Sequence, residues 1–99
     1  MSRDQILEKI REACCAARGG DVDKGIEVLG TCKKELPTGD FNGSCDENAG
    51  RSPWQAARFA YSAMMRCQSE LEEGRNEAAE ACRIASIRYL SYWGGGQAV

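Results

Sequence analysis

Apolar side chains recur at intervals of three and four residues in four stretches of the chain, and turn-forming residues separate those stretches. This spacing places the apolar side chains on one face of an α-helix, whereas a half-buried β-strand needs strict alternation of apolar and polar residues. No segment of the sequence alternates over the length of a strand. The pattern therefore predicts an all-α fold.

Cap and stop signals bound the first two predicted helices. Ser2 followed three residues later by Gln5 has the pattern of a capping box, which marks a helix start. A glycine pair at residues 19–20 ends that run, and Asp21 can cap the next run, which continues to Pro37. We predict these two helices over residues 3–18 and 22–36.

Two glycines interrupt the second predicted helix. Gly25 and Gly30 each lower the stability of a helix by about 1 kcal/mol relative to alanine, because glycine has more backbone freedom to lose. A helix with two such residues forms weakly in isolation. We therefore expect it to depend on packing against its neighbours.

The middle of the chain is rich in Pro, Gly, Asn, Asp and Ser, so residues 37–52 are predicted to form a long polar loop. Ser52 and Pro53 then supply a cap and a favoured first helical residue. Gly74 divides the rest of the chain, and Asn76 can cap the helix after it. The third and fourth helices are predicted over residues 53–73 and 76–93, with a flexible tail at 94–99.

Alanine is frequent on the apolar stripes of the last two predicted helices, and small side chains let helix backbones approach closely. The stripes consist of Ala57, Ala60, Met64, Cys67 and Leu71 in the third helix, and Ala78, Cys82, Ala85 and Tyr89 in the fourth. Residues 1–93 are too few for two domains. We predict one domain, an antiparallel four-helix bundle made of two helical hairpins joined by the long polar loop.

The charge pattern and the absence of histidine narrow the range of functions. Thirteen basic and 15 acidic residues are interleaved and leave a net charge of −2, so no strong field favours nucleic acid. Without imidazole, the usual near-neutral general base and histidine metal ligands are missing. Charged residues also interrupt the first 20 positions, where a signal peptide or a membrane span needs an apolar run. We expect a cytoplasmic, non-enzymatic protein with neither a nucleic-acid nor a membrane partner.

Six cysteines occur without any CxxC pair, so neither a zinc ribbon nor a thioredoxin-like motif is indicated. Free cysteine commonly packs as a small apolar residue, and four of the six fall on predicted core stripes. These four are Cys14, Cys32, Cys67 and Cys82. We therefore expect no cofactor and no bound metal. The alternative hypothesis is a soft-metal or redox protein that uses the helical cysteines as thiolates.

Aromatic side chains gather at the end of the last predicted helix, where a bundle of this size cannot bury every large ring. Exposed aromatic residues often anchor a protein partner, and the same surface could join two copies into a homodimer. The predicted partner-binding residues are Tyr89, Tyr92 and Trp93, with Trp54 as a neighbour. An alternative is a small-molecule pocket between the third and fourth helices, lined by Trp54, Tyr61, Met65 and Tyr89.

The run GDVDKGIEVLGTCKKELP, residues 20–37, resembles the second half of a tetratricopeptide repeat. It has the Gly-Asp turn, the Asp-Lys-x-Ile-Glu helix start and the terminal proline, and LEEGRNEAAEACRIA at residues 71–85 echoes it more weakly. The resemblance implies a helical interaction module, and no binding residues carry over from it. We expect a small protein–protein interaction module, acting as an adaptor, inhibitor, immunity protein or chaperone-like factor.

Overall fold

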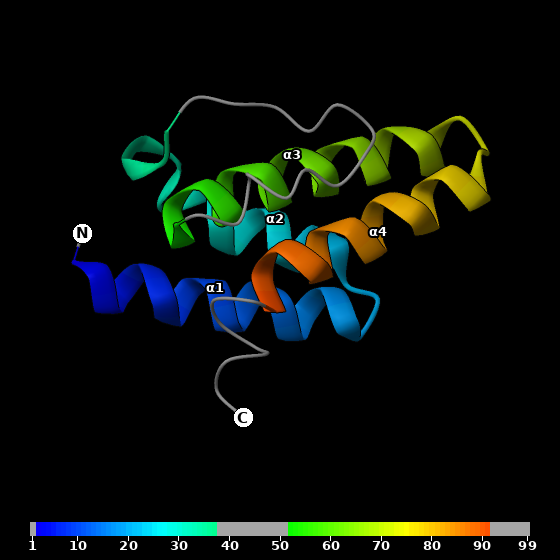
Figure 1. Cartoon of the computed structure of the whole chain (residues 1–99). Helices are drawn as coiled ribbons and strands as arrows, with labels where there is room; N and C mark the ends of the chain where they lie inside the picture. Colours follow the sequence, from blue (N-terminus) through cyan, green and yellow to red (C-terminus); the bar gives the residue numbers. More distant parts are fainter. Residues whose placement is uncertain (1, 38–51, 92–99) are drawn as a thin grey trace.

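A computed structural model of the chain describes residues 2–37 and 52–91 (Figure 1). These residues form five helical elements: α1 (Arg3–Arg18), α2 (Val22–Gly30), the 3₁₀ turn η1 (Lys33–Glu35), α3 (Pro53–Glu72) and α4 (Asn76–Leu90). The predicted loop at 37–52, apart from its two end residues, and the predicted tail at 94–99 lie outside the described residues.

The four α-helices run alternately in opposite directions, as Figure 1 shows. α1 packs against α2 and α3 packs most extensively against α4, while contacts of α2 with α3 and of α1 with α4 close the ring. The predicted antiparallel four-helix bundle of two hairpins is therefore confirmed.

Side-chain caps begin the long helices as the sequence predicts. Ser2 Oγ accepts a hydrogen bond from the Gln5 N–H at 3.2 Å, and Gln5 Oε1 accepts one from the Ser2 N–H at 2.8 Å. Ser52 Oγ accepts from the Gln55 N–H at 3.2 Å, with Pro53 as the first residue of α3. These bonds satisfy amide groups that have no partner within the helix.

The two hairpin turns share one backbone motif. Gly20 has φ of +85° after α1, and Gly74 has φ of +77° after α3. The N–H groups of the next residues, Asp21 and Arg75, each donate a hydrogen bond of 2.8 Å to the carbonyl five residues earlier. This is the Schellman pattern, in which a left-handed glycine ends the helix and satisfies its last carbonyls.

One predicted helix end and one predicted helix cap are wrong. α2 ends at Gly30 and not at residue 36, because Thr31 Oγ1 donates to the Val28 carbonyl at 2.6 Å and the Cys32 thiol donates to the Leu29 carbonyl at 3.4 Å. Side chains that bond to nearby carbonyls in this way compete with helix continuation. α4 begins at Asn76 as predicted, but its cap position is Arg75 and not Asn76, and no side-chain cap bond is made there.

The core follows most of the predicted apolar stripes. Its largest fully buried apolar side chains are Ile6, Ile10, Leu29, Met64 and Leu90. The predicted core cysteines Cys14, Cys32, Cys67 and Cys82 are also buried, as free thiols, whereas Cys15 is exposed. Two stripe residues depart from this pattern: Ala78 of α4 is only half-buried, and Leu71, which continues the stripe of α3, is 53% exposed.

Candidate functional site

The predicted aromatic surface at the end of α4 is only partly within the described residues. Tyr89 is 6% exposed, and its ring packs against Phe59 of α3 with centroids 5.8 Å apart. Tyr92 and Trp93 lie outside the described residues. The described part of this predicted site is therefore a core contact between α3 and α4.

Trp54, Tyr61 and Met65 lie on one side of α3. The Arg3 guanidinium stands 5.3 Å from the centroid of the Trp54 ring, and the Lys33 ammonium stands 5.6 Å from that of Tyr61. Both rings are half-buried and carry a cation over one face, an attractive arrangement worth about 0.5–1 kcal/mol at exposed sites. Met65 is 44% exposed and lies roughly 16 Å from Trp54 along the helix axis. These two residues of the predicted small-molecule pocket therefore lie several turns of α3 apart.

A cleft of about 390 Å³ lies between the two hairpins, where the sequence predicts no site. The α1–α2 connection and the first turn of α2 form one wall, the end of α3 forms the floor, and the first half of α4 forms the other wall. The lining residues are Gly20, Asp21, Val22, Asp23, Cys67, Leu71, Asn76, Ala79, Glu80 and Arg83.

The floor of the cleft is apolar and includes the exposed stripe residue Leu71. Cys67, Val22 and Ala79 are each buried, at 2%, 6% and 2% exposure, so they present little more than their edges to the cleft. Leu71 is open to solvent, and Figure 1 shows that α3 continues past the α1–α2 connection, so at that end α3 is accompanied by α4 and not by α1 or α2.

Two carboxylates stand at the rim on the first turn of α2. Asp21 caps that helix, and its Oδ1 accepts a hydrogen bond from the Lys24 N–H at 3.0 Å. Asp23 Oδ1 accepts a hydrogen bond from the Gln68 side-chain amide of α3. Both aspartates are exposed, and each keeps its second carboxylate oxygen for water or a ligand.

Arg83 spans the cleft and ties the hairpins together. Its Nη1 donates to the Ala17 carbonyl at the end of α1 at 2.8 Å, and its Nε and Nη2 both bond the Glu80 carboxylate, the first at 2.8 Å. This hydrogen-bonded contact lowers the pKa of Glu80 and raises that of Arg83, so both groups are charged at neutral pH. A cation at the last carbonyls of α1 also complements the dipole of that helix.

The thiol at the bottom of the cleft is poorly suited to nucleophilic chemistry. Burial, followed by the charge of Cys82, raises the pKa of Cys67 above its usual 9.0. Burial likewise raises the pKa of Cys82. Since the thiolate is the reactive form of cysteine, the cleft offers an apolar surface and hydrogen-bond acceptors rather than a nucleophile.

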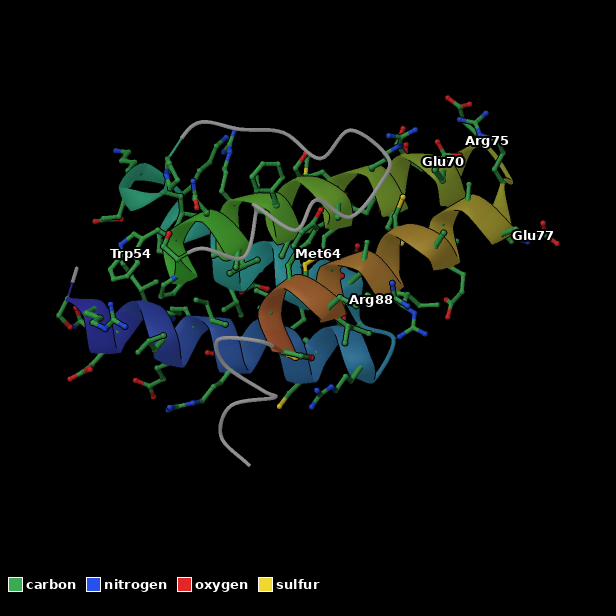
Figure 2. All side chains as sticks on the ribbon, in the orientation of Figure 1. Trp54, Met64, Glu70, Arg75, Glu77 and Arg88 are labelled. Carbon is green, nitrogen blue, oxygen red and sulfur yellow. The ribbon has the colours of Figure 1, made fainter. Side chains whose placement is uncertain are left out.

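The ion pair at the α3–α4 turn lies just beyond the cleft. Figure 2 shows Glu70 and Arg75 together at this turn, where Arg75 Nε and Nη2 bond the two carboxylate oxygens of Glu70 at 2.5 and 3.1 Å. Arg75 also bonds the carboxylate of Glu73. These bonds hold the turn in place, and they lower the pKa of Glu70.

Metal-binding clusters and membrane-spanning helices are both absent from residues 2–37 and 52–91. Within those ranges, no three or more Cys, Asp or Glu side chains are grouped so that they could hold a metal ion. Over the same residues, none of the helices combines the length and the apolar character needed to cross a bilayer. Compared with known proteins, the chain matches no family model, no curated protein and no solved structure.

Proposed function

We propose that this chain is a non-enzymatic protein-binding module whose cleft between the hairpins receives a side chain of the partner against its apolar floor. The observation that carries the proposal is the position of Leu71, a core-stripe residue left 53% exposed beside the buried Val22 and Ala79. An apolar floor inside a polar rim is the arrangement found at the centre of many protein interfaces.

The energy available at this position is sufficient for an anchor. Fully burying one Leu-sized side chain contributes about 1.5–3 kcal/mol, and an entering partner side chain would also cover part of Leu71. The remaining affinity would come from the polar rim and the surrounding surface. Residues 20–23 supply one wall of the cleft, and they belong to the segment 20–37 that resembles the second half of a tetratricopeptide repeat, a resemblance that also favours an interaction role.

The proposal is tested by selecting displayed random peptides against the folded full chain. We expect the selected peptides to bind Leu71→Ser at least about tenfold more weakly, equivalent to 1.4 kcal/mol, than the native chain. Ile84→Ser is the matched control, because Ile84 is exposed to a similar extent, 42%, and does not line the cleft. Both variants should keep the native melting temperature within a few degrees, since each replaces a side chain that faces water.

Two results would contradict the proposal. One is an equal loss of peptide binding in Leu71→Ser and Ile84→Ser. The other is binding that leaves the backbone amide resonances of the cleft residues unchanged while shifting those of another surface. Measuring the molar mass of the chain in solution alongside the peptide titration would separate peptide binding from pairing of two copies.

A further inference from the structure

We propose that the side chain received by the cleft is a lysine or an arginine, with its apolar stem on the floor and its cationic head between the aspartates of α2. This inference rests on the proposed function, because it specifies the occupant of the same cleft. It follows from the positions of the lining groups, with apolar groups on the floor of the cleft and charged groups on its walls.

The floor suits a methylene stem. Cys67, Leu71 and Ala79 provide apolar surface, whereas the charged lining residues belong to the two walls. Lysine and arginine bury their aliphatic stems along such surfaces and keep the charged head at a polar edge. A purely apolar side chain would leave the rim carboxylates without a direct partner.

The sign of the charge in the cleft favours a cation. Three carboxylates and one guanidinium line it, and that guanidinium is already bonded to Glu80 and to the Ala17 carbonyl. Asp21 and Asp23, in contrast, accept their hydrogen bonds from neutral donors, the Lys24 backbone N–H and the Gln68 side-chain amide. The positive ends of α2 and α4 offset about half an elementary charge each, so the carboxylates still prevail.

The charges of the cleft disfavour an anionic occupant. A carboxylate placed on the same floor would face Asp21 and Asp23 across the cleft, and it would have to compete with Glu80 for Arg83. Like charges in contact cost free energy, and the desolvation of a carboxylate adds to that cost. The cleft should therefore discriminate by charge between ligands of equal size.

Four small probes of similar length test this selectivity on the full chain: n-butylammonium, n-butylguanidinium, butyrate and n-butanol. Binding is followed through the backbone amide resonances of the cleft residues. We expect the two cations to shift the amides of Val22, Asp23 and Leu71 with at least about tenfold greater affinity than butyrate. Raising the ionic strength from about 0.15 M to 1 M, which shortens the screening length from about 8 Å to 3 Å, should weaken the cations and not butanol.

Asp23→Asn is the decisive variant. Asparagine keeps a side-chain oxygen that can accept the hydrogen bond from Gln68, so the wall is preserved while the charge is removed. Glu27→Gln, on the same helix and outside the cleft, removes an equal charge. We expect Asp23→Asn to weaken both cations severalfold and Glu27→Gln to leave them unchanged.

The outcomes separate this inference from the proposed function. If the cations and butanol shift the Leu71 amide with equal affinity, the inference about charge is wrong, while the proposed docking of a partner side chain on the apolar floor stands. Equal weakening in Asp23→Asn and Glu27→Gln would also overturn it, since the effect would then be a general one of net charge. If no probe shifts the cleft amides, the inference is again wrong, and the peptide selection decides the proposed function independently.

Discussion

The close approach of α2 to α3 at Gly25 gives a quantitative test of the packing. A Cβ atom at this position would lie 2.7 Å from Met64 Sδ and 2.9 Å from Met64 Cε, inside van der Waals contact. Met64 is fully buried, and Figure 2 places it in the interior of the bundle, so its thioether would have to shift within the core. Gly25→Ala should therefore strain the core at the α2–α3 contact.

Two opposing effects set the size of this change. Overpacking a core costs about 1–3 kcal/mol, whereas alanine in place of glycine within a helix gains about 1 kcal/mol. Gly25→Ala should consequently lower the free energy of unfolding by about 1 kcal/mol. Gly30→Ala is the matched control in the same helix, because its Cβ would meet nothing within 4 Å. It should raise the free energy of unfolding by up to about 1 kcal/mol.

Urea unfolding of both variants measures this difference in the free energy of unfolding, which should be about 2 kcal/mol between Gly25→Ala and Gly30→Ala. The slope of the free energy against urea concentration should be unchanged. A double-mutant cycle with Met64→Ala identifies the cause, since shortening Met64 removes the atoms that the new Cβ would meet. The cost of Gly25→Ala should then disappear or change sign. Stabilisation by Gly25→Ala equal to that by Gly30→Ala, or additive effects in the cycle, would refute this explanation.

Three further predictions concern the turn, the cleft and the thiols. The hydrogen bond from Arg75 lowers the pKa of Glu70 below 4.5. The stabilisation from this pair is therefore complete above pH 4.5 and is lost as the pH falls through the lowered pKa. Glu70→Gln and Arg75→Met should each remove this part of the acid-induced fall in melting temperature. Arg83→Lys should lower the free energy of unfolding by about 1 kcal/mol in urea titrations, because an ammonium cannot make the same three bonds. Cys15→Ser should remove one rapidly alkylated thiol from the native protein, whereas Cys14→Ser should remove none, because Cys14 is buried.

Helix ends were predictable where a side chain or a glycine decides them locally. Ser2 with Gln5 fixes the start of α1, and the glycines at 20 and 74 supply the left-handed residues that close both hairpin turns. The end of α2 was not predictable in this way. The stripe that continues to Leu36 favours a longer helix, and the competing bonds of Thr31 and Cys32 to their preceding carbonyls become visible only in the folded backbone.

The cleft could not be predicted from periodicity. Periodicity identifies the face of α3 that contains Leu71, and it carries no information about whether a neighbouring helix is long enough to cover that residue. Asp21 and Asp23 are read from the sequence as helix-start residues, which they are. Their second role, as one wall of a cleft against α4, depends on how the two hairpins dock.

The pairing of α3 with α4 also bears on the order of folding. These helices share the most extensive contact in the bundle, and only Glu73, Gly74 and Arg75 separate them. Contacts that close such a short loop cost little chain entropy, and proteins rich in them fold quickly. We therefore expect the α3–α4 hairpin to form first and to serve as the template on which α1 and α2 dock. The cleft would then appear only in the last step, when the carbonyl end of α1 reaches Arg83.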